Sequence, residues 1–320
     1  MTGHYNLRME LQPMRIAVLG VGAMGSVYAT FFAEAGHEVW AVDKWAEHVS
    51  AINASGLRLS GISGDRSVNS VQAVMDVGTV PKCDLYVIAT KGSGVAEAAK
   101  AISKVMPSHA MVLAIQNGLG AGAQVSDYLP ETAVLLGVAD GFGAEIRAPG
   151  HAHHNAMKLI RLGEIQGGRT ERLDQLEEIW RNAGFNAQAF GDIHQLIWEK
   201  YICNVALSGP CTVFKCNIGE LLKNSDFRSI SLGCLNEAYT VGCAEGINFS
   251  FDDAEAYLER FVAMMPDAVP SMRQDHLAGR KSEIEFINEM VPIVAKRHGM
   301  VAPYNQTIST IIRRIEEAFQ

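Results

Sequence analysis

The chain has 320 residues, which corresponds to about two domains of ordinary size. A hydrophobic content of 48% and a charged content of 19% are typical of a globular enzyme with a large core. The net charge of −8 argues against nucleic acid or an anionic membrane as a partner, and no apolar run approaches the roughly 20 residues of a transmembrane helix. Residues 1–13 are polar and lack the apolar stretch of a signal peptide, and the six cysteines include no C-x-x-C pair. We therefore expect a cytoplasmic protein with reduced thiols and a short N-terminal extension.

The first predicted strand, residues 15–19, leads directly into a glycine-rich turn. The turn has the form G-x-G-x-x-G, and its residues are Gly20, Val21, Gly22, Ala23, Met24 and Gly25. Helical periodicity begins at about residue 23, so the motif stands between a strand and a helix, as a dinucleotide-binding turn does. In such a turn the first glycine allows the tight bend, the second lets a pyrophosphate approach the backbone, and the third lets the helix pack closely. The N–H groups at the start of the helix then face the phosphates.

The second predicted strand, residues 37–42, ends in an acid. Asp43 lies 18 residues after Gly25, close to the roughly 20 expected for a carboxylate that binds the ribose hydroxyls of NAD. Such a carboxylate repels the 2′-phosphate of NADP, although Lys44 beside it could offset part of that repulsion. The sequence therefore favours NAD, with NADP as the alternative.

Strands and helices alternate through the first half of the chain. Right-handed crossovers and a mostly parallel sheet follow from this alternation. Residues 139–162 are strand-like and rich in glycine, and we expect them to be antiparallel at the edge of the sheet. The other elements expected here are a helix over 23–35, a helix over 46–55, a hairpin within 57–70, a strand over 84–90, a helix over 95–105, strands over 110–115 and 133–138, a helix over 170–183 and a strand over 185–190. Together they predict a Rossmann-type, doubly wound α/β domain over residues 14–191.

From Asp192, a plausible helix N-cap, only helical periodicity follows. It predicts an all-α domain over residues 192–320. We expect this domain to bind the substrate and to form a homodimer. The expected helices cover 194–207, 218–222, 227–245, 252–264, 271–297 and 307–318.

Polar residues recur at helical spacing on two of these helices. Lys200, Asn204 and Ser208 follow one another at intervals of four and share one face of the first helix. A lysine and an amide on a mostly apolar helix are costly unless they have partners, although a lysine at the rim of the helix is the alternative. Ser271, Asp275 and Glu283 share a face of the helix expected over 271–297, where Asp275 could equally belong to a solvated stripe.

Two further polar residues follow predicted strands. Lys91 comes after the strand over 84–90, and Asn117 comes after the strand over 110–115. Ligands of open parallel sheets lie at the carboxyl ends of the strands, so both residues are candidates for ligand contacts. The alternatives are a solvated loop lysine for Lys91 and a left-handed turn residue for Asn117.

Taken together, these motifs resemble the ketopantoate reductase family. The resemblance runs from Met14 nearly to the end of the chain. It is carried by the glycine turn, Thr90-Lys91, residues 116–120, residues 198–200 followed by Asn204, residues 270–275 and residues 283–288. It implies a Rossmann domain followed by a helical domain, with the active site in the cleft. The implied reaction reduces the ketone of 2-dehydropantoate to (R)-pantoate, usually with NADPH.

The resemblance also implies a catalytic pair. Lys200 would be the general acid that protonates the ketone oxygen, and Glu283 would hold and tune that lysine and contact a substrate hydroxyl. This is physically sensible, because desolvation lowers the pKa of a lysine toward neutrality and its positive charge stabilises a developing alkoxide.

The remaining site residues implied by the resemblance bind ligands. Asn204 would orient the substrate, Ser271 would bind its carboxylate, and Ser208 occupies the position of a second substrate-binding asparagine. Asn117 would help to place both the substrate carbonyl and the nicotinamide, and Lys91 would bind the cofactor.

Some positions depart from the NADPH-using members of the family. Asp43 replaces a basic residue, Ser208 replaces the second asparagine, and Ala268 stands where another asparagine is common. Residues 42–45 and 211–218 look more like the NAD-dependent D-2-hydroxyacid dehydrogenases of the D-mandelate type. A bulky 2-oxo acid other than ketopantoate is therefore a second candidate substrate.

Three other functions are alternatives. His151 and His153 could pair as zinc ligands, but no third ligand follows at a sensible spacing, which favours a plain polar edge strand and no metal. A non-catalytic NAD-binding sensor would not need the proton donor that Lys200 provides. A 3-hydroxyacid dehydrogenase would share the two-domain plan and a catalytic lysine, but its substrate motifs are missing.

Overall fold

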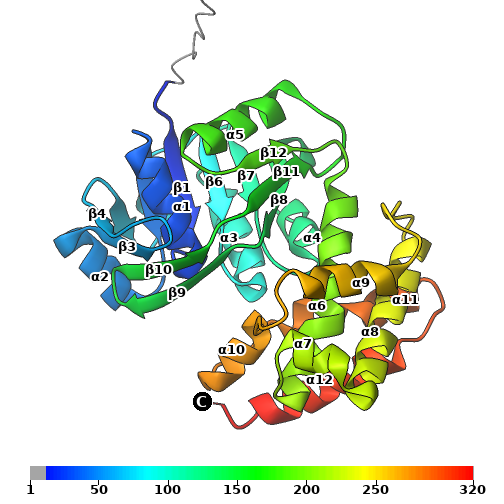
Figure 1. The fold of residues 1–320 in the computed structure, drawn as a ribbon. Coiled ribbons are helices and arrows are strands. Elements are labelled where there is room, and N and C mark those ends of the chain that lie inside the picture. Colours follow the sequence, from blue (N-terminus) through cyan, green and yellow to red (C-terminus); the bar gives the residue numbers. More distant parts are fainter. Residues whose placement is uncertain (1–11, 320) are drawn as a thin grey trace, which may run out of the picture.

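The structure is a computed structural model, and it describes residues 12–319. Of the N-terminal extension expected over residues 1–13, only Gln12 and Pro13 lie within the described residues. A domain built on a large sheet is followed by a bundle of helices (Figure 1), which confirms the predicted fold class. Among residues 12–319, none of the helices combines the length and the apolar character needed to span a bilayer.

The main sheet has eight strands in the order β12-β11-β8-β7-β6-β1-β2-β5. The six strands from β8 to β5 are parallel, β11 runs antiparallel to β8, and β12 is parallel to β11. The strands are β1 (Arg15–Leu19), β2 (Glu38–Val42), β5 (Gln72–Val74), β6 (Leu85–Ile88), β7 (Met111–Ala114), β8 (Val134–Asp140), β11 (Leu159–Glu164) and β12 (Ala187–Ala189). This arrangement brings the carboxyl ends of β1, β2, β6 and β7 to one edge of the domain.

Helices cover both faces of the main sheet, as a doubly wound domain requires. One core contains side chains of α1 and α5, and the other contains side chains of α3, of α4 and of the residues that follow α4. The helices are α1 (Ala23–Glu34), α2 (Ala46–Ser55), α3 (Val95–Ile102), α4 (Ala121–Ser126) and α5 (Glu171–Asn182), with short 3₁₀ turns η1 (Val77–Thr79), η2 (Gly92–Gly94) and η3 (Glu131–Ala133).

A second, four-stranded sheet has the order β4-β3-β10-β9. Its strands are β3 (Leu57–Gly61), β4 (Arg66–Val68), β9 (Gly143–Ala148) and β10 (His151–Ala156). The hairpin predicted within 57–70 is confirmed as β3 and β4. The prediction that residues 139–162 lie at the edge of the main sheet was wrong for β9 and β10. Phe142, Ala144 and Ile146 instead pack on the core around α1, which draws this part of the chain into the second sheet.

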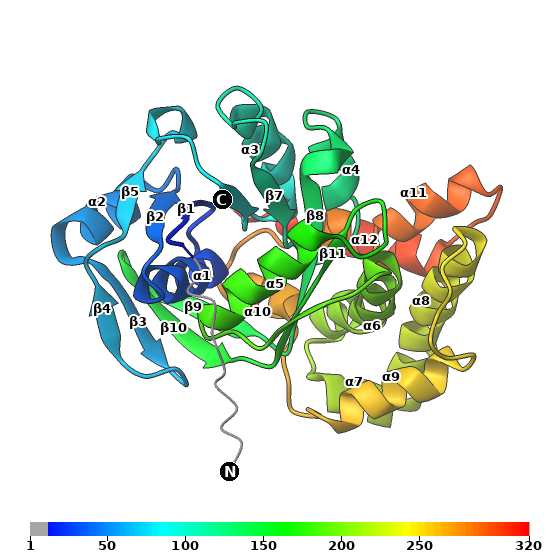
Figure 2. The ribbon, with the colours of Figure 1, turned by 90° about the horizontal axis from the view of Figure 1, so that it is seen from above.

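The helical domain is organised around α6 (Ile193–Phe214), which begins after the N-cap Asp192 and packs against α7, α8, α10 and α12. Figure 2 shows this domain beside the sheet domain. The other helices are α7 (Ile218–Lys223), α8 (Ser225–Ala244), α9 (Ala254–Ala263), α10 (Ser271–Leu277), α11 (Met290–Arg297) and α12 (Pro303–Glu316), with the 3₁₀ turn η4 (Ile284–Phe286). Helix α6 runs beyond the end predicted at Leu207, through Pro210. Because Pro210 cannot donate to the carbonyl of Ala206, the Ser231 hydroxyl donates to it instead, at 2.8 Å.

The single helix predicted over 271–297 was wrong. Helix α10 ends at Leu277, and Gly279 adopts a φ of +66°, a left-handed conformation that favours glycine. The chain then forms a loop before η4 and α11. Ser271, Asp275 and Glu283 therefore do not share one face of a helix.

Candidate active site

The glycine turn has the geometry that a dinucleotide requires. Gly20 has a φ of +86°, and a Cβ atom on it would lie 2.5 Å from the backbone nitrogen of Thr90. A Cβ on Gly25 would lie 2.1 Å from the carbonyl oxygen of Gly20. Gly22 is the N-cap of α1, provides no side-chain cap, and has open space where a Cβ would be. The first N–H groups of α1 and the space above Gly22 thus fit a pyrophosphate.

Asp43 follows β2 beside this turn and is half-buried. Its Oδ1 accepts a hydrogen bond from the backbone N–H of Trp45 at 3.0 Å. The neighbouring Lys44 forms an exposed ion pair with Glu97 of α3. Because Glu97 already neutralises Lys44, this lysine offers less compensation for the negative charge of Asp43 than the sequence suggested.

Lys200 connects the helical domain with the strand ends of the sheet domain. Its Nζ donates to the Oδ1 of Asn117 at 2.8 Å and to the carbonyl oxygen of Ala139 at 2.6 Å. Burial lowers the pKa of Lys200, while the nearby carboxylates of Asp140 and Glu283 oppose that shift. Lys200 and Asn117, which lie 83 residues apart in the sequence, are thus brought together.

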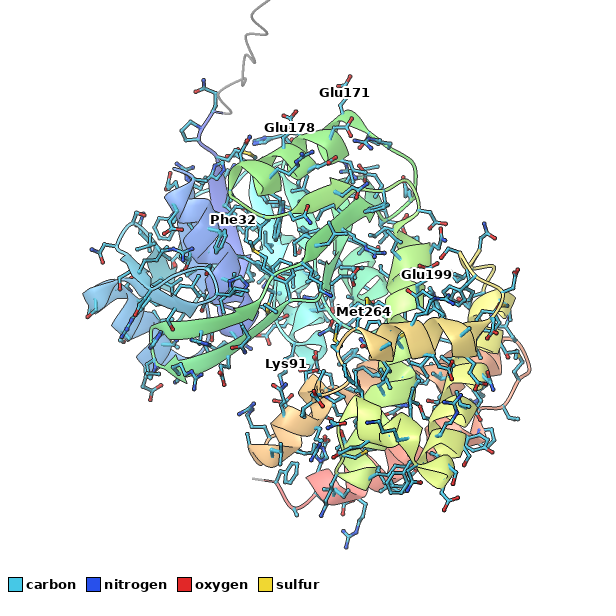
Figure 3. The ribbon with its side chains drawn as sticks, viewed as in Figure 1. Phe32, Lys91, Glu171, Glu178, Glu199 and Met264 are labelled. Atoms are coloured by element: carbon cyan, nitrogen blue, oxygen red, sulfur yellow. The ribbon has the colours of Figure 1, made fainter. Side chains whose placement is uncertain are left out.

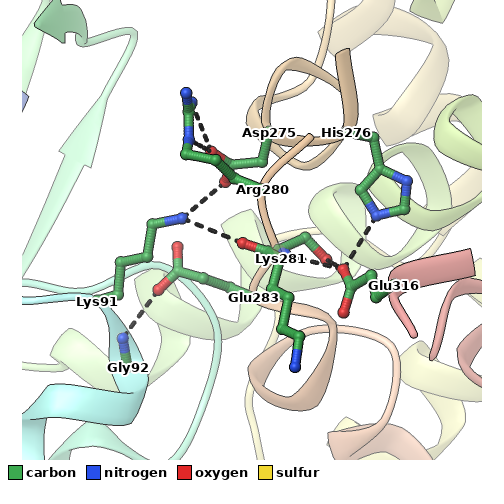
Figure 4. A network of polar contacts seen from close by, with 9 residues as sticks. Lys91, Gly92, Asp275, His276, Arg280, Lys281, Glu283 and Glu316 are labelled. Atoms are coloured by element: carbon green, nitrogen blue, oxygen red, sulfur yellow. Dashed lines mark hydrogen bonds and ion pairs between the residues drawn. The ribbon is translucent and has the colours of Figure 1, made fainter. Parts of the chain in front are cut away.

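Lys91, labelled in Figure 3, and Glu283 form a second connection between the domains, which Figure 4 shows from close by. The Nζ of Lys91 donates to the Oδ2 of Asp275 at 2.8 Å, and the backbone N–H of Gly92 donates to the Oε1 of Glu283 at 2.9 Å. Burial raises the pKa of Glu283, and the Gly92 N–H and the charge of Lys91 partly oppose this. The carboxylate of Glu283 therefore acts on Lys200 through its charge, while its hydrogen bond goes to Gly92.

The remaining predicted substrate residues lie on α6 and α10, which pack against each other. Asn204 follows Lys200 by about one turn and is half-buried, whereas Ser208 is only 4% exposed. Ser271 is exposed in the first turn of α10. Two contacting helices thus carry these three residues, and Ser208 is the most enclosed of them.

Phe286 in η4 closes the helical domain onto the strand ends, and sequence reasoning did not single it out. Its carbonyl oxygen accepts from the backbone N–H of Leu119 at 3.0 Å. A Cβ on Gly118 would lie 2.2 Å from that oxygen, and a Cβ on Gly92 would lie 2.5 Å from the phenyl ring. The two glycines were visible in the sequence, but nothing there indicated which residue approaches them.

The histidines considered as zinc ligands have another partner. His151 Nε2 and His153 Nδ1 lie 2.8 Å and 3.0 Å from the hydroxyl oxygen of Ser60. No cluster of three or more candidate metal ligands occurs within residues 12–319. The prediction that this segment is an edge strand was wrong, because β10 lies between β3 and β9. The alternation of its side chains could not show that it has a neighbour on each side. All six cysteines lie within the described residues and are free, and five of them are buried.

Comparison with known proteins agrees with this geometry. Two sequence models describe ketopantoate reductase PanE/ApbA and its C-terminal part, and they match residues 16–167 and 192–316. The 2-dehydropantoate 2-reductase of Lactococcus lactis subsp. lactis is 27% identical, over 95% of this chain and 98% of that protein. The enzyme of the same name from Pyrococcus abyssi is 28% identical, over 94% of this chain and 97% of its own.

Solved structures of related proteins share the whole architecture. A PanE/ApbA family ketopantoate reductase from Ralstonia eutropha JMP134 has a TM-score of 0.87 and 28% identity, covering 95% of this chain and 99% of its own. A complex of D-mandelate dehydrogenase with NADH has a TM-score of 0.86 and 25% identity, covering 96% of this chain and 100% of its own. The matching sequence models account for most of the chain, and the chain therefore belongs to the ketopantoate reductase PanE/ApbA family.

Proposed function

We propose that this protein reduces the ketone of a 2-oxo acid to the (R)-2-hydroxy acid with a nicotinamide cofactor, as a 2-dehydropantoate 2-reductase. The observation that carries the proposal is the position of the Lys200 ammonium. It lies at the strand ends between Asn117 and Ala139, and burial lowers its pKa. Ketone reduction requires a proton donor on the edge of the sheet where the dinucleotide binds, and Lys200 lies among the strand ends of that edge.

The cofactor would be held by residues of the sheet domain. The residues of the glycine turn, Gly20 to Gly25, and the start of α1 suit its pyrophosphate, Asp43 suits a ribose hydroxyl, and Lys91 and Asn117 suit the half nearer the cleft. A bound nicotinamide supplies the hydride.

In this proposal the protein's own residues bind the acid and move one proton. Lys200 donates a proton from Nζ to the ketone oxygen, and its positive charge stabilises that oxygen as negative charge develops. Asn117 fixes the ammonium group, and the negative charge of Glu283 favours its protonated form. Asn204, Ser208 and Ser271 would orient the substrate, with Ser271 binding its carboxylate.

The test is an assay of a panel of 2-oxo acids, including ketopantoate and phenylglyoxylate, with NADH and with NADPH. Oxidation of either cofactor that depends on one of these acids would support the proposal. Binding of a cofactor without turnover of any acid would contradict it and favour a sensor. Preference for an aromatic or other bulky 2-oxo acid would identify a D-2-hydroxyacid dehydrogenase, the second candidate, which Asp43 and the related D-mandelate dehydrogenase support.

We expect NADH to be preferred over NADPH, and Asp43→Ala to narrow that preference. The ratio of the two kcat/KM values should fall about fivefold to tenfold, since one repulsion of about 1 kcal/mol at a hydrated site is lost. Asp127→Ala is the matched control, because Asp127 is an exposed acid after α4. An unchanged ratio in Asp43→Ala would remove Asp43 from cofactor recognition.

We also propose that the protein resides in the cytoplasm, where its free thiols are stable.

We further propose that it forms a homodimer through the helical domain. Tyr304 and Ile311 of α12 are 44% and 38% exposed and line an apolar groove of about 330 Å³. Light scattering should give a mass of two chains, and Ile311→Asp should give one chain, because a buried charge is costly. Ile62→Asp, at an exposed position of the sheet domain, should remain dimeric. A monomeric parent protein would contradict this proposal.

A further inference from the structure

Asp275, which the sequence placed in a possible solvated stripe, joins the two domains instead. Only 13% of its side chain is exposed. Its Oδ2 accepts from the Nζ of Lys91 at 2.8 Å, and its Oδ1 accepts from the Nε and Nη2 of Arg280 at 3.0 Å and 2.8 Å (Figure 4). Both carboxylate oxygens are therefore engaged, one by each domain.

Lys91 needs such a partner in order to hold one position. It directly precedes η2 at the carboxyl end of β6, and its side chain is 51% exposed. A lysine side chain in that setting samples many rotamers, and ordering it costs free energy. Asp275 takes one of the three ammonium hydrogens, and the carbonyl oxygen of Lys281 lies 3.5 Å away. At least one donor of Lys91 remains for a ligand in the cleft.

We propose that Asp275 is a positioning residue, which holds the Lys91 ammonium ready for the cofactor, and that Arg280 fixes the Asp275 carboxylate. The inference rests on the proposed function, because it takes Lys91 as a cofactor ligand. Its physical basis is preorganisation: a lysine that is ordered before binding loses less entropy when the cofactor arrives.

The segment that carries Asp275 is itself held by the last helix. Glu316 of α12 is 7% exposed, and its Oε1 accepts from His276 Nε2 at 3.0 Å, the backbone N–H of Ser282 at 2.8 Å and the Ser282 hydroxyl at 2.6 Å. These donors are next to Asp275 on one side of the loop and next to Glu283 on the other. The fixed loop lets a carboxylate of the helical domain set the position of a lysine in the sheet domain.

The sign of the change in cofactor affinity distinguishes positioning of Lys91 by Asp275 from competition with the cofactor. If the carboxylate competed with the cofactor for Lys91, then Asp275→Asn would free the lysine and tighten binding. If it orders the lysine for the cofactor, the same change must weaken binding.

The experiment measures the Kd of NADH, with NADPH in parallel, by fluorescence titration of the full chain. The variants are Lys91→Ala, Asp275→Asn and the double variant. Asp275→Asn should raise the Kd about threefold to tenfold, the cost of ordering one long side chain. The double variant should match Lys91→Ala alone, because Asp275 acts only through Lys91. Asp65→Asn is the matched control, since Asp65 pairs with Arg58 in the second sheet.

Further measurements separate positioning from a general structural role. In Asp275→Asn the KM for the cofactor should rise while kcat at saturating cofactor changes little, and Asp275→Glu should restore part of the affinity. If Asp275→Asn does not fold, Arg280→Gln replaces it and should show a smaller rise in Kd.

Three results would overturn the inference. The first is that folded Asp275→Asn binds the cofactor as tightly as the parent protein or more tightly. The second is that Asp275→Asn still weakens binding when Lys91 is already alanine. The third is that Lys91→Ala does not change the Kd. A parent protein that binds neither NADH nor NADPH would contradict the proposed function. If the parent protein binds the cofactor and only Lys91→Ala weakens that binding, the role of Asp275 is contradicted and the proposed function is not.

Discussion

Replacing Lys200 by alanine is expected to lower kcat for the reduction of a 2-oxo acid by about a thousandfold or more, the combined loss of a general acid and of a charge beside the developing alkoxide. The structure gives the reason, because Lys200 is the ammonium group that Asn117 and Ala139 hold at the strand ends. The measurement is the steady-state rate with the best acid of the panel.

Cofactor affinity should stay nearly intact in Lys200→Ala, because Lys200 is on α6 and the proposed pyrophosphate site is at the start of α1. Lys104→Ala, at an exposed position after α3, is the matched control and should retain full activity. An equal loss of cofactor affinity and of rate would contradict the role of Lys200 as a proton donor.

The pH profile provides an independent readout of the same role. A general acid must be protonated before it acts, so the rate of ketone reduction should fall as the pH rises through the pKa of Lys200. Burial lowers that pKa, so the fall should begin below the pH at which an ordinary lysine titrates. Oxidation of the hydroxy acid needs the neutral amine and should show the reverse dependence. An alkaline limb that stays the same in Lys200→Ala would assign the titration to another group.

Elements with complete local signals were predictable from the sequence. The turn from β1 to α1 needs only glycines at fixed spacing between an apolar strand and a helix, and all of these signals lie within residues 15–34. The candidate residue Lys200 was found in the same way, because a charge on an apolar helix needs a partner. The identity of its partners, Asn117 and the carbonyl of Ala139, lay beyond the sequence.

Features that depend on distant partners were not predictable. Asp275 has the spacing of a solvated stripe, and the lysine that pairs with it lies 184 residues earlier in the chain. The end of α10 was missed because Gly279 looks tolerable within a helical pattern, although its φ is +66°. The side chains of β9 and β10 would alternate between the two faces in the same way in either sheet. Only the packing of these strands on α1 therefore decides which sheet they join.

A variant in the glycine turn can be compared with a variant at the other end of α1 that has the same backbone strain. Gly20 and Gly36 have φ values of +86° and +88°, so alanine at either position costs about 1–2 kcal/mol of stability. A Cβ on Gly36 meets open space, whereas a Cβ on Gly20 would lie 2.5 Å from the backbone of Thr90. Only Gly20→Ala must therefore displace the turn.

Gly20→Ala is expected to weaken NADH binding by about tenfold to a hundredfold, because a displaced turn loses at least one hydrogen bond to a charged phosphate. Gly36→Ala should lower the melting temperature and leave the Kd of NADH unchanged, since Gly36 only ends α1, away from the turn. Fluorescence titration and thermal unfolding of both variants provide the comparison. If both lost affinity equally, backbone strain alone would explain the effect, and if neither did, the cofactor would lie away from the tip of β1.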